Sequence, residues 1–295
     1  MAKLLDGRPV AERIRASLQD ALGERAATGR PRPNLVIVMA GDDPASASYA
    51  QSKTRLCERL GLKCAVHHFP ATIGEAPLTQ EIARFAQDPS VHGLLVELPL
   101  PKGLSTLDMF RGIPVTKDVE GMSVESVARL AQGSPLFVPA TPAAVLRLLD
   151  HYEIDVQGRH VVVVGRSRVV GRPLASLLLT RNATVTVCHS FTPDLAAVTR
   201  QADILVVAMG QPHFIGPRHV RAGAVVIDVG TNYQDGVLRG DVDFAQVEPV
   251  ASWISPVPGG VGLVTTSLLV QNVVRAAEIQ EAPAQHPWVM GGLIT

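Results

Sequence analysis

The sequence predicts an α/β protein of two domains, and three observations support this expectation. Short runs of Val, Ile and Leu, typical of buried parallel strands, alternate with stretches of helical periodicity. The alternation stops near Pro139 and Pro142 and then starts again, which divides the chain into two parts. The length of 295 residues suits two domains, and a hydrophobic content of 46% can fill two cores.

The first part begins with a helix and continues with three strands. Val10, Ile14, Leu18 and Leu22 recur at every fourth position and predict a helix over residues 6–27. Later apolar runs are bounded by Gly, Pro and Asp, as strands and helices are. The elements expected after the first helix are strands 35–40, 63–69 and 93–97 and helices 46–60 and 77–87.

The second part repeats the alternation. Thr141 can cap a helix over residues 142–151. The elements expected next are strands 160–164, 184–188, 204–207 and 224–228 and helices 172–181 and 194–201. A last helix over 264–278 is expected to return to the first domain. We therefore expect one domain from residues 1–139 plus 268–295, and another from residues 140–267.

The composition argues against several classes of protein. Lys plus Arg and Asp plus Glu are both 27, so the chain lacks the positive charge expected of a nucleic-acid-binding protein. No apolar stretch reaches about 18 residues and none follows the N-terminus, so we expect no membrane span and no signal peptide. The three cysteines form no C-x-x-C pair and the histidines show no metal-ligand spacing. This pattern favours reduced thiols, a cytoplasmic protein and no bound metal.

The most informative local segment is HVVVVGRSRVVGRP at residues 160–173. Four valines predict a buried strand, Gly165 and Ser167 follow in a turn, and Gly171 opens a helix. Backbone N–H groups at the start of such a helix can bind a diphosphate. The spacing G-x-S-x-x-x-G departs from the usual G-x-G-x-x-G, so an ordinary strand–helix turn stays open as an alternative. We favour a Rossmann-type nucleotide site.

The end of the next strand discriminates between nucleotides. Sites for NAD usually carry Asp or Glu there, which binds the ribose 2′-hydroxyl. Here the strand ends in His189 and Ser190, and Arg166 and Arg168 lie in the preceding turn. Cations and a hydroxyl suit a 2′-phosphate, which favours NADP over NAD. The alternative is that these arginines are solvated loop charges.

Tyr49 and Lys53 are four residues apart, on one face of the helix expected over 46–60. A Tyr-x-x-x-Lys spacing occurs in some reductases, but a solvated helix face is its commoner origin. Short-chain reductases place this pair after the nucleotide motif, whereas here it lies more than a hundred residues before Gly165. Taken alone, the pair is weak evidence for catalysis.

A series of motifs along the chain strengthens the evidence that Tyr49 and Lys53 are functional. The motifs are Gly41-Asp-Asp-Pro-Ala-Ser46, Gly93-Leu-Leu-Val-Glu-Leu-Pro-Leu-Pro101, Lys117-Asp-Val-Glu-Gly121, Thr141-Pro142, Gly165-Arg-Ser-Arg-Val-Val-Gly-Arg-Pro173, Val226-Ile-Asp-Val-Gly230, Gly240-Asp-Val242 and Pro256-Val-Pro-Gly-Gly-Val-Gly262. In this order, the chain resembles the bifunctional methylenetetrahydrofolate dehydrogenase/cyclohydrolase family from about residue 3 to residue 278.

The resemblance implies two α/β domains with a cleft between them, the second a Rossmann-type NADP-binding domain. It implies an enzyme of one-carbon metabolism that oxidises methylenetetrahydrofolate to the methenyl cation with NADP, and then hydrolyses the cation to formyltetrahydrofolate. It also implies a homodimer. No nucleic acid or membrane is an expected partner.

The resemblance also assigns roles to residues of this chain. Lys53 is the expected catalytic lysine of hydrolysis, and Tyr49 and Glu97 join it in the catalytic set. The expected folate-binding residues are Tyr49, Glu120, Pro258, Gly259, Gly260 and Leu263. The expected cofactor-binding residues are Thr141, Gly165, Arg166, Ser167, Val170, Gly171, Arg172, His189, Ser190, Gly210, Gly230 and Thr231.

The chain departs from the family pattern in or near the expected pocket. Glu97 stands where the family has glutamine, Glu120 where it has aspartate, and changes also occur at 140–144 and 263–264. A carboxylate at position 97 should pair with Lys53 and hold it as ammonium, which is a poor general base. We therefore expect dehydrogenation to survive and hydrolysis to be weakened.

Several alternatives stay open. Glu97 could instead stabilise the methenyl cation, or the changes could be neutral in a compensated pocket. The chain could also be a specialised paralogue acting on a modified folate or one-carbon substrate. A homologue that binds folate and nucleotide without turnover is a further alternative.

Overall fold

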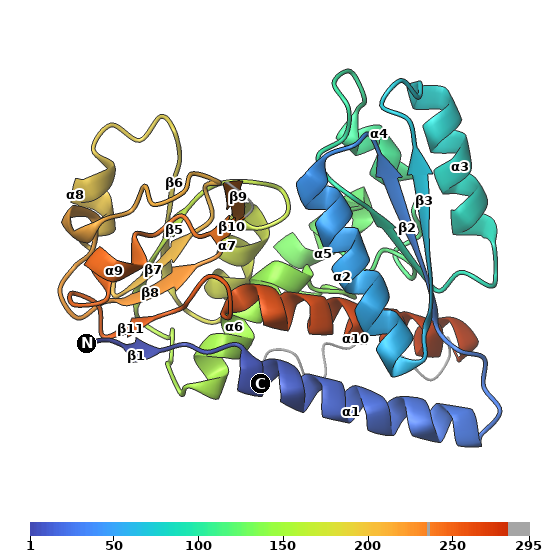
Figure 1. The fold of residues 1–295 in the computed structure, drawn as a ribbon, viewed down its shortest axis with the longest axis horizontal. Helices are drawn as coiled ribbons and strands as arrows, with labels where there is room; N and C mark the ends of the chain where they lie inside the picture. Colours follow the sequence, from blue (N-terminus) through green and yellow to red (C-terminus); the bar gives the residue numbers. More distant parts are fainter. Residues whose placement is uncertain (235–236, 283–295) are drawn as a thin grey trace. The chain divides into compact units, whose positions relative to one another are not determined.

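The computed structural model describes residues 1–234 and 237–282, which form two compact units (Figure 1). Unit 1 comprises Met1–Arg13 and Ala140–Thr265. Unit 2 comprises Ile14–Pro139 and the chain from Thr266 onward. Two of the three boundaries fall within helices α1 (Arg8–Ala27) and α10 (Val261–Glu281), and the third lies between Pro139 and Ala140. Residues 283–295, the end of the segment expected in the first domain, lie outside the described residues.

Unit 1 is built on a six-stranded sheet in which every pairing is parallel. In order across the sheet, the strands are β1 (Lys3–Leu4), β11 (Trp253–Ile254), β8 (Val225–Asp228), β7 (Ile204–Val207), β5 (His160–Val164) and β6 (Thr184–Cys188). The central strands are buried on both faces, which explains their runs of Val, Ile and Leu. The chain passes from β5 to β6 on one side and then to β7 on the other, so the strand order reverses at β5.

Helices and short elements complete unit 1. They are α6 (Ala140–His151), α7 (Gly171–Thr180), α8 (Leu195–Thr199), the 3₁₀ helix η1 (Pro217–His219), α9 (Phe244–Val247) and the antiparallel strands β9 (Asn232–Gln234) and β10 (Val237–Arg239). Residues 1–13, which the sequence placed with the first domain, are grouped here with unit 1. The reason is local, because Lys3 and Leu4 extend its sheet alongside Trp253 and Ile254.

Unit 2 contains a three-stranded parallel sheet of order β3 (Lys63–Phe69), β2 (Asn34–Ala40) and β4 (Gly93–Val96). Since β3 and β4 lie on opposite sides of β2, right-handed crossovers place the helices α2 (Pro44–Leu60) and α3 (Glu75–Gln87) on opposite faces (Figure 1). Its shorter helices are α4 (Thr106–Arg111) and α5 (Val124–Ala131). The core on the α3 face joins strand valines to Leu78, Ile82 and Phe85.

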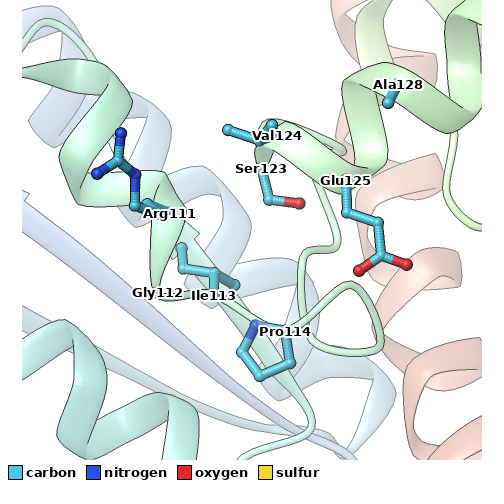
Figure 2. Close-up of a pocket in the computed structure, with 8 residues that line it drawn as sticks. All are labelled: Arg111, Gly112, Ile113, Pro114, Ser123, Val124, Glu125 and Ala128. Carbon is cyan, nitrogen blue, oxygen red and sulfur yellow. The ribbon is translucent and has the colours of Figure 1, made fainter.

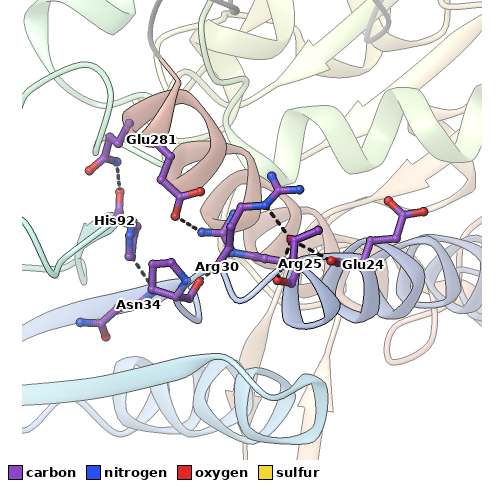
Figure 3. A network of polar contacts seen from close by, with 9 residues as sticks. Glu24, Arg25, Arg30, Asn34, His92 and Glu281 are labelled. Atoms are coloured by element: carbon purple, nitrogen blue, oxygen red, sulfur yellow. Dashed lines mark hydrogen bonds and ion pairs between the residues drawn. The ribbon is translucent and has the colours of Figure 1, made fainter.

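Polar contacts fix the end of α10 within unit 2 (Figure 3). The buried Arg25 forms an ion pair with Glu281, and its Nε donates to the Pro31 carbonyl (2.8 Å). The Gln280 amide donates to the carbonyl of His92 (2.7 Å), and Asn34 N–H donates to His92 Nδ1 (3.1 Å). The predicted return of the last helix to the first part of the chain is therefore observed.

The two α/β domains and the Rossmann-type topology of the second are confirmed. Each predicted strand and helix overlaps an observed one. The sequence did not predict the two-residue strands β1 and β11, the antiparallel strands β9 and β10, the 3₁₀ helix η1, or α4, α5 and α9. Among the described residues, no helix combines the length and the apolar character needed to cross a membrane.

Candidate functional site

The expected cofactor residues of unit 1, except Thr141 in α6, follow the strands at one edge of its sheet. Because the strands are parallel, the segments that follow β5, β6, β7 and β8 all leave from the same edge. Residues 165–172 follow β5, His189 and Ser190 follow β6, Gly210 follows β7, and Gly230 and Thr231 follow β8. Open α/β sheets bind their ligands at this edge, where the strand order reverses.

The turn after β5 has no space for side chains at its glycines. Gly165 has φ +124°, and a Cβ built there would lie 2.1 Å from the carbonyl oxygen of Ala208. A Cβ on Gly171 would lie 2.0 Å from the oxygen of Gly165. Both positions therefore require glycine. Helix α7 packs tightly against the turn, and the turn packs tightly against Ala208, which follows β7.

The start of α7 is open to an anion. Val170 precedes the helix and supplies no side-chain cap, while Ser167 Oγ accepts the Val170 N–H (3.1 Å). Arg166 and Arg168 are exposed, and among the described residues neither forms an ion pair. The Arg166 guanidinium lies over the ring of Phe191, 5.8 Å from its centroid. Exposed cations beside an uncapped helix start suit a phosphate.

In unit 2, the structure brings Lys53 and Glu97 together. Lys53 Nζ donates to Glu97 Oε1 at 2.5 Å. The two side chains are only 13% and 8% exposed, so water screens this ion pair weakly. The predicted pairing of Glu97 with Lys53 is observed.

The local sequence explains how the two side chains meet. Asp43 caps α2 by accepting the Ser46 N–H (2.8 Å), and Ser46 Oγ donates to the Leu98 carbonyl (3.1 Å). The start of α2 is thereby tied to the segment that follows β4. Glu97 N–H in turn donates to the Val38 carbonyl (2.8 Å), which continues the sheet by one residue. Helix α2 then carries Lys53 two turns further on.

Tyr49 and Glu120 belong to the same unit. Tyr49 is half-buried one turn before Lys53 on α2. Glu120 is half-buried in a segment that runs beside β4, where Leu94 N–H donates to the Lys117 carbonyl (2.8 Å). This segment is fixed by Asp118, whose carboxylate accepts the Ser123 N–H at 2.7 Å. Pro258, Gly259, Gly260 and Leu263 lie in unit 1 instead.

Comparisons with known proteins match this chain along most of its length. Residues 5–120 match the catalytic domain of tetrahydrofolate dehydrogenase/cyclohydrolase, and residues 139–281 match its NAD(P)-binding domain. The chain belongs to the tetrahydrofolate dehydrogenase/cyclohydrolase family. The resemblance found in the sequence is confirmed.

Individual members of the family are similar over nearly their whole length. The bifunctional protein FolD of Geobacillus thermodenitrificans is 47% identical over 94% of this chain and 97% of its own. The crystal structure of the bifunctional FolD enzyme of Campylobacter jejuni is 40% identical with a TM-score of 0.89, covering 94% of this chain and 99% of its own. The Trypanosoma brucei FolD structure, complexed with NADP cofactor and inhibitor, is 36% identical with a TM-score of 0.88, covering 94% and 97%.

The residues at the sheet edge fit the cofactor of this family. Gly165 and Gly171 let α7 begin in close contact with the turn after β5. A helix start at this place in the sheet is suited to a diphosphate. Strand β6 ends at Cys188, and the half-buried His189 and exposed Ser190 follow without a carboxylate. A site without this negative charge, near the exposed Arg166, suits a 2′-phosphate such as that of NADP.

Two predicted cofactor glycines donate hydrogen bonds to buried aspartates. The N–H of Gly210 donates to Asp241 Oδ2 (3.0 Å), and the N–H of Gly230 donates to Asp228 Oδ1 (2.9 Å). These N–H groups are therefore already bonded to buried carboxylates of the family's NAD(P)-binding domain. Both aspartates lie within motifs of the sequence, but neither was predicted to belong to the site.

A hollow in unit 2 does not coincide with the family's expected site. Its volume is about 470 Å³. The residues that line it are Arg111, Gly112, Ile113, Pro114, Ser123, Val124, Glu125 and Ala128 (Figure 2). None of the predicted site residues lines it. We do not assign the active site to this hollow, because its lining residues include no close acid–base pair like that of Lys53 and Glu97. Among the described residues, no cluster of His, Cys, Asp or Glu could hold a metal ion.

Proposed function

We propose that this protein is an NADP-dependent methylenetetrahydrofolate dehydrogenase in which hydrolysis of the methenyl product is weakened. The observation that carries the second part is the ion pair between Lys53 and Glu97. The first part rests on the presence of both family domains and of a turn that fits NADP.

We assign folate binding to the residues that unit 2 presents around β4 and α2. The Glu120 carboxylate is a suitable acceptor for the amino and ring N–H donors of a pterin edge. Tyr49 supplies an aromatic face for the flat part of the folate. The glycines at 259 and 260 are proposed to let the backbone of unit 1 approach a ligand closely, since Gly259 has φ +117°.

We assign cofactor binding to the sheet edge of unit 1. NADP, when bound, supplies a nicotinamide ring that accepts a hydride. The N–H groups at the start of α7 are proposed to hold the diphosphate, and Arg166, His189 and Ser190 to surround the 2′-phosphate. Hydride transfer needs little acid–base chemistry from the protein, so orientation of the two ligands is its main contribution.

Hydrolysis makes a different demand. Water must lose a proton as it attacks the methenyl cation, and a neutral lysine amine can accept that proton. Lys53 Nζ instead donates to Glu97 Oε1 at 2.5 Å in a largely buried ion pair. A lysine held in this contact is not free to take a proton from water. The dehydrogenase step does not need this proton transfer and is expected to persist.

One absorbance experiment tests both parts of the proposal. The purified protein is mixed with methylenetetrahydrofolate and NADP, and NADPH and the methenyl product are followed together. We expect NADPH to form while the methenyl product accumulates. Formyl product that appears as fast as NADPH would contradict weakened hydrolysis. If no NADPH forms although calorimetry shows that both ligands bind, the chain is a binding homologue without turnover.

The family resemblance leads us to propose two further properties. The protein is expected to be a homodimer and to work in the cytoplasm on a one-carbon unit carried by folate. Light scattering coupled to size-exclusion chromatography tests the first, and fractionation of the source cells tests the second.

A further inference from the structure

Two buried carboxylates lie at the sheet edge of unit 1. Asp228 is the last residue of β8 and is 3% exposed, and Asp241 follows β10 and is 0% exposed. Within residues 1–234 and 237–282, neither forms an ion pair with a cation. Burying a carboxylate without a cation is costly unless several donors surround it. The donors in this case are N–H groups of the loops around the aspartates.

Asp241 fixes the loop that follows β7. Its Oδ2 accepts the N–H groups of Met209 (2.7 Å) and Gly210 (3.0 Å), and its Oδ1 accepts that of Gln211 (2.8 Å). Oδ1 also accepts the side-chain amide of Asn232 at 2.9 Å. Three consecutive N–H groups directed at one carboxylate leave this loop little freedom.

Asp228 holds Asp241 in place. Its Oδ1 accepts the N–H of Asp241 (3.0 Å), and its Oδ2 accepts that of Val242 (2.9 Å). A Cβ built on Gly240 would lie 1.9 Å from Asp228 Oδ2, and one on Gly230 would lie 2.3 Å from Asp241 Cγ. Neither carboxylate can therefore shift without moving backbone.

The loop fixed by Asp241 directly follows Ala208, which packs against the Gly165 turn. Ala208 precedes it, and Ala208 N–H donates to the Val164 carbonyl (2.8 Å) at the end of β5. The oxygen of Ala208 is the atom that a Cβ on Gly165 would meet at 2.1 Å. The position of residues 208–211 thus sets the space left for the Gly165 turn.

We propose that Asp241, aligned by Asp228, is a positioning residue for NADP, which fixes the loop after β7 against the Gly165 turn through three backbone N–H bonds. It acts through the loop and does not bind the cofactor itself. The inference rests on the proposed use of NADP by this chain. It also gives a role to two buried carboxylates that have no cation partner among the described residues.

The test uses Asp241→Asn in the full chain. An Asn side chain has a single carbonyl oxygen, and its NH₂ group would face N–H donors that need an acceptor. We expect NADP to bind at least about tenfold more weakly by calorimetry, with kcat at saturating NADP and the folate KM unchanged. Asp243→Asn is the matched control, because the Asp243 side chain caps α9 and accepts its hydrogen bonds from Gln246.

The possible outcomes are distinct. Wild-type affinity for NADP in Asp241→Asn would overturn the inference, and so would an equal loss of kcat and folate affinity, which indicates general disruption. If Asp241→Asn fails to fold, Asn232→Ala decides, since it removes one donor to Asp241 Oδ1 without changing charge. It should raise the NADP KM by about threefold, and an unchanged value would overturn the inference. Failure of the wild-type protein to bind NADP would instead refute the proposed function.

Discussion

Replacing Glu97 by Gln tests the Lys53–Glu97 ion pair most directly. The substitution removes the negative charge and nearly preserves the volume, and the amide oxygen can still accept a hydrogen bond from Lys53. It also restores the residue expected from the family pattern. Lys53 is then no longer held in an ion pair, so hydrolysis of the methenyl cation should accelerate.

The structure sets the size of the expected effect. At the observed 2.5 Å, with an effective dielectric constant of about 20, the attraction is about 7 kcal/mol before desolvation is counted. Desolvation of two largely buried ions offsets most of this, which leaves a net coupling of about 1–3 kcal/mol. General-base catalysis contributes about 10²–10⁴ to a rate, so we expect E97Q to hydrolyse the methenyl substrate at least about tenfold faster.

Two rates must be measured on the same preparations. Decay of added methenyltetrahydrofolate reports hydrolysis, and NADPH formation from methylenetetrahydrofolate reports the dehydrogenase. The control is Glu58→Gln, the same change on an exposed position of α2, which should alter neither rate. Hydrolysis that is unchanged or slower in E97Q would refute the reasoning. A large fall in the dehydrogenase rate would support the alternative in which Glu97 stabilises the cation.

Three further predictions concern unit 1. Gly165→Ala should cost about 3 kcal/mol or more in urea unfolding, because its Cβ would lie 2.1 Å from the Ala208 oxygen at φ +124°. Gly216→Ala, whose Cβ would meet nothing within 4 Å, should cost less than about 0.5 kcal/mol, and equal costs would contradict the steric argument. Ser190→Asp should raise the KM for NADP about five- to tenfold by repelling the 2′-phosphate, and an unchanged ratio of NADP to NAD activity would show that Ser190 lies outside the site. Burial raises the pKa of Asp228 from 3.8 to about 7, so the folded state holds this proton more tightly and the contribution of Asp228 to stability falls as pH rises through that window. Compared with Asp228→Asn, the wild-type free energy of unfolding should lose up to about 4 kcal/mol across the window, and parallel pH profiles would contradict this.

Much of the fold could be predicted because its signals are local. The valines of β5 and the apolar run of β7 are buried on both faces, and parallel strands of this kind give continuous hydrophobic segments. The strands β1 and β11 contain two residues each, which is too short for any periodicity to show. Their pairing depends on where the rest of the sheet ends, and the sequence of Lys3 and Leu4 does not contain that information.

The pairing of Lys53 with Glu97 could be predicted only through the family resemblance. The two residues are 44 positions apart, on a helix and after a strand, and no spacing rule joins them. The contact depends on the bond from Ser46 to Leu98, which ties the start of α2 to the segment after β4. A substitution from glutamine to glutamate could be read from the sequence, but its near-complete burial with Lys53 could not.

The buried aspartates of unit 1 show what kind of signal was overlooked. Their partners are backbone N–H groups from several loops, and every residue carries such a group, so side-chain chemistry alone cannot reveal them. The neighbouring glycines do carry information. Gly230 stands two residues after Asp228, and a Cβ there would collide with the carboxyl group of Asp241. Gly240 stands immediately before Asp241, and a Cβ there would collide with the carboxyl group of Asp228. At these two positions glycine accompanies a carboxylate enclosed by backbone, so substituting Gly230 or Gly240 should disturb the NADP site as much as substituting the aspartate does.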